Sequence, residues 1–346
     1  MSISTAPFGR GSVTGPSLPS RDRQGAVRGG ALLAVLWLSA ALSAIAFSLA
    51  STVRGETERT ATALDSLRSY YLATGALERA SLYMDWGSGQ VNPDGSPRYW
   101  ASWTALMRFQ FPSGDAMVEV IPESGKLNLN TAPVEDLFAL LMSLGAEPER
   151  ARQIALGIVD WRTPAPGGLP TEFDHYYLGL APSFHARHAS FEEIEEVLLI
   201  KAMTPDLFHG SYVTDAEGRL HPRGGFRDCV TVYGGAGRID VNTAAPALLA
   251  AVKLSPAAVA WIVETRRQMP FQKMEQLAAV AGEPGFHRLG IGGGTIYTLR
   301  ATARLRLAGG ALSDLRRTVA ATIKRLPPGF DRTYHVLRWH DNAWTP

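Results

Sequence analysis

The longest apolar stretch of the chain lies near its start. Residues 29–53, GGALLAVLWLSAALSAIAFSLASTV, contain no charged side chain and are flanked by Arg28 and Arg54. As a helix, this run is long enough to cross the hydrocarbon core of a bilayer. The segment before it is rich in arginine and poor in acid, which predicts a cytoplasmic N-terminus and a body on the far side of the membrane. A secretory signal peptide is the alternative, but its apolar region covers only about 7–15 residues.

The helical pattern continues beyond the apolar run. Leu64, Leu67 and Tyr71 recur at helical spacing among charged residues, so the helix should continue to about Asp85. A helix that is apolar in its first half and amphipathic in its second suits a subunit that sits in a bilayer and packs its upper half on a globular head.

Apolar and polar residues alternate in two parts of the chain that lie far apart. The first part holds strand candidates at 104–111 and 116–122, joined by a hairpin-like turn, and a short one at 126–130. The second part is the tail, with candidates at 295–307, 314–326 and 333–342. Such alternation predicts an antiparallel sheet with one buried face, to which both parts contribute.

Helical spacing dominates the residues between these two parts. The expected helices are 134–145, 148–162, 190–200, 245–252, 256–268 and 271–282, and short strands are expected at 211–215, 229–234 and 238–242. Ser190 should cap its helix, with Glu193 completing a capping box. Residues 163–190 are expected to form a loop. The order of helix, strands, helical block and strands predicts an α+β fold with an insertion.

One short pattern occurs twice in this block. KLNLNTAPVEDLFALL (126–141) and RIDVNTAAPALLAAV (238–252) each lead from a strand through Asn-Thr-Ala into a helix. A side-chain cap and a proline in the first turn are common at helix starts. The expected caps are Asn130 or Thr131 and Asn242 or Thr243, followed by Pro133 and Pro246.

Composition narrows the function. The chain has 346 residues, enough for two domains and an appendage, and its net charge is +2. Four arginines and one aspartate precede residue 29, so the body alone carries a net charge of −1 and lacks the global basic field of most nucleic-acid binders. Cys229 is the single cysteine, which excludes an intramolecular disulfide and favours a small buried side chain.

Candidate catalytic chemistry is sparse. The spacing of His175, His185 and His188 fits no compact metal template, and no Ser or Cys stands in a nucleophile elbow. The glycine-rich residues 290–294 lack the Gly-Lys-Ser/Thr ending of a phosphate loop. The protein is therefore not expected to be an enzyme.

The start of the apolar run, RGGALLAVLWL, resembles the class III signal of pilins and pseudopilins. In those families a prepilin peptidase cuts a short basic leader on the cytoplasmic side. The resemblance places leader cleavage at Arg28, Gly29 and Gly30, with the cut after Gly29; a cut after Gly30 is the alternative. A plain membrane anchor is another alternative, but it would not explain the Arg-Gly-Gly sequence at the start of the apolar run.

The fifth mature position sharpens this resemblance. Most family members have Glu there, thought to pair with the N-terminal amine of the neighbouring subunit, whereas this chain has Ala34, or Val35 for the alternative cut. Because an unpaired carboxylate in a membrane is costly, a subunit with no neighbour above it can dispense with one. In lacking this Glu, the chain resembles the K-type minor pseudopilins of type II secretion. The resemblance implies a place at the tip of the pseudopilus.

Further motifs extend the resemblance over most of the chain. In order they are Asn128-Leu129-Asn130-Thr131, Asp160-Trp161, Tyr176-Tyr177, Ser190-Phe191-Glu192-Glu193-Ile194 and Asn242-Thr243-Ala244. The implied fold is a pilin-like long N-terminal helix on an antiparallel sheet, with a large inserted, mainly α-helical domain of helix-hairpin-helix or SAM-like units. The expected boundaries are 1–29 leader, 30–53 transmembrane helix, 54–130 stem and first strands, 131–285 inserted domain and 286–346 final strands.

The resemblance also implies a metal. Calcium stabilises the inserted domain of known family members, and hard oxygen ligands are available here. The candidate ligands are Asp160, Glu172, Asp174, Glu193 and Glu196. The family's Asp-Trp is usually followed by further acids, whereas residues 162–165 here are Arg-Thr-Pro-Ala. Calcium therefore remains an expectation, alongside a solvated acidic face that needs no metal.

The main rival is a membrane-anchored helix-hairpin-helix DNA receptor of natural competence, which the doubled motif also resembles. There, a Gly-hydrophobic-Gly turn brings backbone N–H groups to a DNA phosphate. This chain has Gly-Ala-Glu-Pro at 145–148 and Lys-Leu-Ser-Pro at 253–256, so neither turn has the glycine pair. Nucleic acid is not an expected partner.

The function expected from the resemblance is structural. It is that of a minor pseudopilin at the tip of the type II secretion pseudopilus, which initiates or caps the fibre for protein export across the outer membrane. The implied partners are I-type and J-type minor pseudopilins, the major pseudopilin, prepilin peptidase and the inner-membrane secretion platform. Also implied are methylation of the new N-terminus and a single-pass location in the cell inner membrane with a periplasmic head.

Overall fold

The computed structural model describes residues 28–87, 90–215, 217–234, 237–292, 294–327 and 329–343. Most of the predicted leader, residues 1–27, lies outside this range. The chain divides into two compact units between Leu64 and Asp65, inside the first helix.

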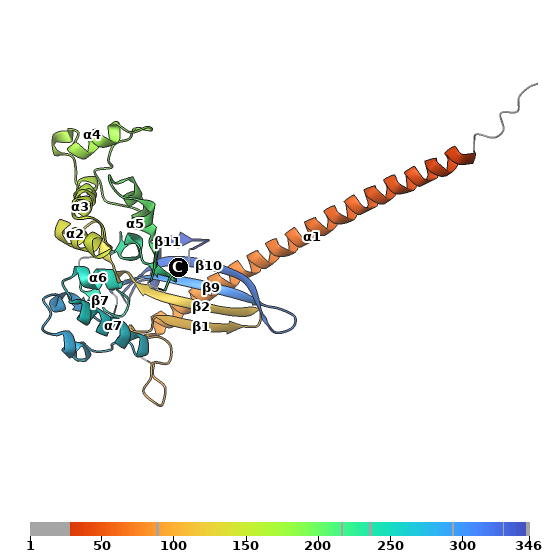
Figure 1. Ribbon diagram of the computed structural model, residues 1–346. Helices are drawn as coiled ribbons and strands as arrows, with labels where there is room; N and C mark the ends of the chain where they lie inside the picture. The colour runs from red at the N-terminus through yellow and green to blue at the C-terminus, as the bar shows by residue number, and fades with distance from the viewer. Residues whose placement is uncertain are drawn as a thin grey trace, which may run out of the picture. The chain divides into compact units, whose positions relative to one another are not determined.

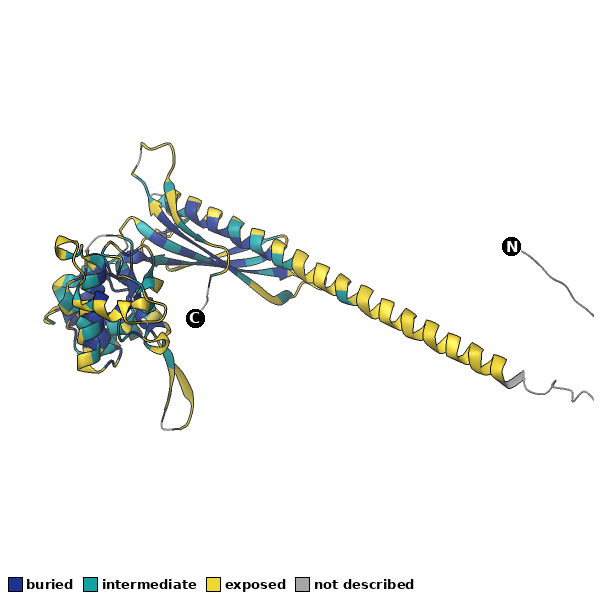
Figure 2. Cartoon of the chain, turned by 90° about the horizontal axis from the view of Figure 1, so that it is seen from above, coloured by how far each residue is buried: buried dark blue, intermediate teal, exposed yellow. Residues whose placement is uncertain are grey.

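The first helix, α1 (Arg28–Trp86), is a continuous run of 59 residues, and the prediction that it extends past the apolar stretch is confirmed. Its apolar side chains in the first unit face outward, including Leu32, Trp37 and Phe47, which are 73%, 73% and 78% exposed. Figure 2 shows this part of the helix as an almost uniformly exposed ribbon. The helix is long and apolar enough to cross a membrane, with a mean hydropathy of 2.2 over its best window, which suggests membrane anchoring.

Within the second unit, a five-stranded antiparallel sheet joins the two alternating parts of the sequence (Figure 1). Its strands, in the order β1-β2-β9-β10-β11, are β1 (Leu106–Phe111), β2 (Gly114–Pro122), β9 (Ile296–Arg306), β10 (Leu312–Arg325) and β11 (Tyr334–His340). The predicted tail strands are thus confirmed, and β9 pairs with β2 although more than 170 residues separate them.

The sheet buries one face against the end of α1. Strand β9 alternates strictly, so that Leu299, Ala301 and Ala303 point inward and are fully buried. They share a hydrophobic core with helix residues such as Ala73 and Ala76. Small side chains on both elements let the helix backbone approach the sheet closely, because alanine adds almost no bulk between them.

The residues between β2 and β9 form a mainly helical region with a separate core. Its helices are α2 (Val134–Ser143), α3 (Pro148–Arg162), α4 (Glu172–Leu178), α5 (Pro205–His209), α6 (Pro246–Ala251) and α7 (Pro256–Gln268). Its 3-10 turns are η2 (Glu123–Gly125), η3 (Pro166–Gly168), η4 (Ile194–Leu199), η5 (Phe226–Asp228), η6 (Met274–Val280) and η7 (Phe286–Arg288). Its strands pair as β3 (Leu127–Asn128) with β6 (Val230–Thr231), β4 (Ser211–Thr214) with β5 (Leu220–Arg223), and β7 (Ile239–Asp240) with β8 (Leu289–Gly290).

Two expected helices are 3-10 turns instead. The segment expected to be helical at 190–200 is helical only as η4, whose N-cap is Glu193, so Ser190 as the cap was wrong. The capping acid is Glu196, which accepts the backbone N–H groups of Glu192 and Glu193. The second expected helix, 271–282, is the corresponding turn η6. The predicted loop 163–190 also contains a helix, α4, capped by Thr171.

The predicted caps of the doubled motif were also wrong. Helix α2 has Pro133 as its N-cap residue and α6 has Ala245, and neither uses a side-chain cap. Pro246 does occupy the first turn of α6 as expected. The asparagines of the motif are occupied elsewhere, in contacts described below.

Candidate functional sites

The two Asn-Thr-Ala segments belong to two structural copies. Copy 1 comprises β3, α2, α3 and η4 with β6, and copy 2 comprises β7, α6, α7 and η6 with β8. In both, the short strand pairs in parallel with a strand that follows in the chain, and the two helices form a hairpin. Helices α2 and α6 meet where the Ser143 hydroxyl donates to the Ala247 carbonyl at 2.8 Å.

Each asparagine bridges from its turn to a distant loop. The Asn130 side chain accepts from the N–H of Phe191 at 2.7 Å and donates to its carbonyl at 3.0 Å. Asn242 does the same with Phe271, at 2.8 and 2.9 Å. The amide supplies a donor and an acceptor to one backbone, which fixes the loop start relative to the strand end.

An arginine at the end of the second helix of each copy closes the same turn. Arg162 donates to the carbonyls of Leu129 and Ala132, the latter at 2.6 Å. In copy 2, the Arg266 guanidinium donates to the carbonyls of Val241 and Ala244, at 2.8 and 2.7 Å. Burial lowers the pKa of both arginines.

Sequence reasoning missed these contacts, although a signal was present. The segment Ile158-Val159-Asp160-Trp161-Arg162 aligns with Ile262-Val263-Glu264-Thr265-Arg266, and Phe191 to Glu196 aligns with Phe271 to Gln276. Gln276 caps η6 through the N–H groups of Gln272 and Lys273, as Glu196 caps η4. The repeat therefore extends well beyond Asn-Thr-Ala.

Internal side chains lie at the turns between the paired helices. Gly145 and Lys253 take equivalent left-handed conformations, with φ of 81° and 68°. In copy 2 the N–H of Ser255 donates to the Glu283 carboxylate at 2.9 Å, and this carboxylate would repel a phosphate. In copy 1 the Arg223 guanidinium lies against Gly145 and donates to the Leu144 carbonyl.

Two of the candidate metal ligands, Asp160 and Asp174, lie close together. Both accept from the Thr171 hydroxyl, at 3.1 and 3.4 Å. Asp174 also accepts from the N–H groups of Thr171 and Ala186, each at 3.0 Å, and lies 2.8 Å from Nε2 of His188. These bonds tie α4 to the end of α3 and to the segment that follows α4.

The environment separates the pKa values of the two acids. Burial raises the pKa of Asp160, partly opposed by its bond from Thr171. Burial has the same effect on Asp174, but its bonds from Thr171, His188 and Ala186 outweigh it and lower the pKa to about 2. For His188, burial lowers the pKa. The hydrogen bonds to the Asp174 carboxylate and to the Thr163 carbonyl raise it by more, so the net shift of the pKa is upward.

The other three candidate ligands do not join this pair. Glu196 accepts from the Trp161 ring N–H at 3.0 Å and caps η4. Glu193 pairs with Arg338 of β11, and Glu172 is exposed on the first turn of α4. Among the residues that the structure describes, no group of three or more Asp, Glu, His or Cys side chains is arranged to hold a metal.

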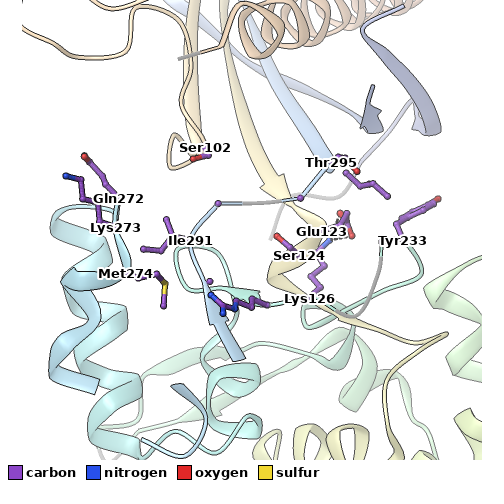
Figure 3. Close-up of a pocket in the computed structure, with 17 residues that line it drawn as sticks. Ser102, Glu123, Ser124, Lys126, Tyr233, Gln272, Lys273, Met274, Ile291 and Thr295 are labelled. Atoms are coloured by element: carbon purple, nitrogen blue, oxygen red, sulfur yellow. Dashed lines mark hydrogen bonds and ion pairs between the residues drawn. The ribbon is translucent and has the colours of Figure 1, made fainter. Parts of the chain in front are cut away.

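One pocket of the second unit has a volume of about 770 Å³ (Figure 3). Glu123, Lys126 and Tyr233 line one side, and Lys273 and Met274 line another. The Glu123 carboxylate pairs with Lys126 at 3.0 Å and accepts from Thr298 at 2.6 Å.

The remaining candidates from the sequence are Cys229, two histidines and the leader junction at the start of α1. Cys229 is buried, and burial raises its thiol pKa to about 12, which agrees with a structural role. His175 and His185 are exposed. At the start of α1, Gly30 and Ala34 are exposed, whereas Arg28 and Gly29 are described only as the first residues of the helix.

Part of the chain is similar in sequence to known type II secretion proteins. A family model described as "Type II secretion system (T2SS), protein K" matches residues 120–210, which contain copy 1 except for β6, and the Asp160–Asp174 pair. The type II secretion system protein K of Klebsiella pneumoniae is 26% identical over 200 residues. That match covers 52% of this chain and 60% of the relative's length.

A solved structure shares the fold. It is the crystal structure of the GspK-GspI-GspJ complex from the type 2 secretion system of enterotoxigenic Escherichia coli, and the matched chain has a TM-score of 0.54 at 17% identity. The match covers 83% of this chain and 100% of that one. The family model and the curated relative agree, and part of the chain is similar to type II secretion system protein K, whereas the solved structure shows that the fold is shared.

Proposed function

We propose that the protein is a minor pseudopilin that sits at the tip of a type II secretion pseudopilus and initiates or caps its assembly. The observation that carries this proposal is in α1. Its first part exposes a charge-free apolar surface with Ala34 at the fifth mature position, and its end packs on an antiparallel sheet. The helix can therefore anchor the subunit without a membrane carboxylate that would need a neighbour above it.

The proposed topology places the leader in the cytoplasm, α1 through the inner membrane and the head in the periplasm. Prepilin peptidase would cut after Gly29, and the new N-terminus would be methylated. The solved relative was crystallised in a complex named for GspK, GspI and GspJ, which supports I-type and J-type minor pseudopilins as partners. The major pseudopilin and the secretion platform are the further partners proposed.

The helical region is proposed to be the domain inserted into the pilin-like head. Its two copies have the strand, turn and paired helices of helix-hairpin-helix or SAM-like units, and their hydrophobic core is separate from that of the sheet. Because the asparagine and the closing arginine of each copy bind internal backbone groups, and Glu283 occupies the Ser255 N–H of the copy 2 turn, we assign the copies a scaffolding role. A salt-sensitive gel shift with duplex DNA would instead support the receptor function.

A secretion assay tests the proposal. Deleting the gene should abolish export of type II substrates, and the wild-type gene should restore it. Ala34→Glu should restore export about as well, because a tip subunit gains nothing from a carboxylate that pairs with a subunit above. Better fibre assembly with Ala34→Glu would contradict the tip position.

A further inference from the structure

Copy 1 contains an insertion that copy 2 lacks. Between its closing arginine and its bridged phenylalanine, copy 2 has only residues 267–270, whereas copy 1 has residues 163–190, including α4. The equivalent of Asp160 in copy 2 is Glu264, whose side chain is 63% exposed. The insertion partly buries an acidic position that faces solvent in the other copy, so something must compensate the charge there.

The His188 ring lies at that position and connects both ends of the insertion. Its Nε2 is 2.8 Å from the Asp174 carboxylate, and its Nδ1 is 2.9 Å from the Thr163 carbonyl and 3.2 Å from that of Asp160. Oxygen atoms therefore face both ring nitrogens, and the ring fills the space between the two ends of the insertion. The ring is among the less exposed parts of the insertion, at 15% side-chain exposure.

A calcium ion does not fit the same oxygens. Calcium takes about six to eight oxygen ligands. Both carboxylate oxygens of Asp174 already accept bonds from Thr171, Ala186 and His188. A metal bound there would have to displace the imidazole, which is not one of the oxygen ligands that calcium prefers.

The side chain after Asp-Trp is also unsuited to calcium. Arg162 stands where acids would be expected from the family resemblance, and it closes the copy 1 turn as Arg266 closes that of copy 2. The remaining acids, Glu193 and Glu196, are engaged by Arg338 and by the η4 cap. The oxygens around Asp174 are thus of the kind that bind calcium, but the His188 ring lies among them.

We infer that the His188 ring occupies the place a metal ion would take, and that the hydrogen bonds of Asp160, Asp174 and His188 hold the insertion of this protein together without calcium. This inference concerns the fold and is independent of the proposed function.

The test compares calcium with chelator on the full-length protein in detergent micelles. Calcium at about 10 mM would fill most of even the weak extracellular-type sites, whose Kd is about 10⁻⁴–10⁻³ M. The wild-type melting temperature should shift by less than about 1 °C, and hydrogen exchange of residues 163–190 should be the same in both solutions. A calcium-dependent rise of roughly 2–4 °C, or a calorimetric binding signal that is lost in Asp174→Asn, would overturn the inference.

A variant designed to gain calcium binding tests whether the His188 ring occupies the place of a metal ion. His188→Asp replaces the ring with a third carboxylate near two carbonyl oxygens, and Asp tolerates the positive φ of 48° found here. Its melting temperature should fall in chelator, with faster exchange in residues 163–190, and calcium should restore several degrees. The matched control, His185→Asp, makes the same change at an exposed position of the insertion and should respond to neither condition.

The outcomes are distinguishable. A folded His188→Asp protein that ignores calcium would contradict the assignment of His188 to a cation position. If the variant fails to fold in either solution, the wild-type calcium titration alone decides, because a calcium-stabilised wild type overturns the inference and an indifferent one supports it.

Discussion

Arg162 and Arg266 are equivalent residues: each lies in the last turn of the second helix of its copy and donates to two carbonyls at its own Asn-Thr-Ala turn. The guanidinium closes the turn from the side, and Asn130 or Asn242 joins the same turn to the next loop. The doubled sequence is thus the visible part of a larger duplicated scaffold, which the helical region uses to position its insertion and its contacts with the sheet.

Replacing Arg266 should destabilise copy 2 strongly. Arg266→Met leaves the carbonyls of Val241 and Ala244 without their charged donor, a loss of about 2 kcal/mol. Thermal melting of the full-length protein in detergent should show a lower transition temperature. The neighbouring Arg267 side chain is 72% exposed, and Arg267→Met should leave the transition almost unchanged. Equal effects from both variants would contradict the proposed role of Arg266.

The asparagine bridge gives a second prediction. Asn242→Asp keeps the acceptor for the Phe271 N–H but loses the donor to the Phe271 carbonyl and places a carboxylate beside it. We expect a loss of about 1–3 kcal/mol, because a partly buried acceptor is left unpaired. Hydrogen exchange should locate the effect in the loop before η6. If this loop exchanged its amide hydrogens as slowly in the variant as in the wild type, the result would be evidence against the bridge.

Parts of this architecture could be predicted from sequence because they depend on local periodicity. The 59-residue helix and the β9 alternation are of this kind. The Asn130 contact joins residues 61 positions apart, and local pattern favoured a helix cap instead. The same is true of Asp174, whose partners Thr171, Ala186 and His188 meet only when the insertion folds. Comparing the two copies along their full length would have revealed the arginines.

The contact between β11 and α1 predicts alkaline sensitivity. The Tyr334 hydroxyl donates to Glu78 at 2.7 Å, and burial together with this carboxylate raises the phenol pKa to about 12. The folded pKa lies above the unfolded value of about 10, so this stabilisation is complete below pH 10 and is lost as the pH rises toward 12.

The wild-type melting temperature should therefore fall more between pH 10 and pH 12 than that of Tyr334→Phe. The variant should also be less stable at neutral pH by about 1 kcal/mol. Tyr71→Phe, at a position that is 64% exposed, is the matched control and should behave as wild type. Parallel pH curves for wild type and Tyr334→Phe would refute the contribution of this bond.

Cys229 should be unreactive in the folded protein. Its thiol is buried and its pKa is raised to about 12, so thiolate is scarce at pH 8. A colorimetric thiol reagent should detect no fast reaction under native conditions and one thiol per chain after denaturation. Rapid native labelling would show that the surrounding β6 region opens readily.

The proposal that this is a pseudopilin is tested most directly at its N-terminus. The measurement is intact-protein and N-terminal peptide mass spectrometry of the chain produced with and without an active prepilin peptidase. With the peptidase, residues 1–29 should be absent and the methylated N-terminus should begin at Gly30; without it, the leader should remain. Gly29→Ala together with Gly30→Ala should block processing, whereas Gly55→Ala, within the same helix, should not. Peptidase-independent cleavage, or an uncut chain that still supports secretion, would contradict the account.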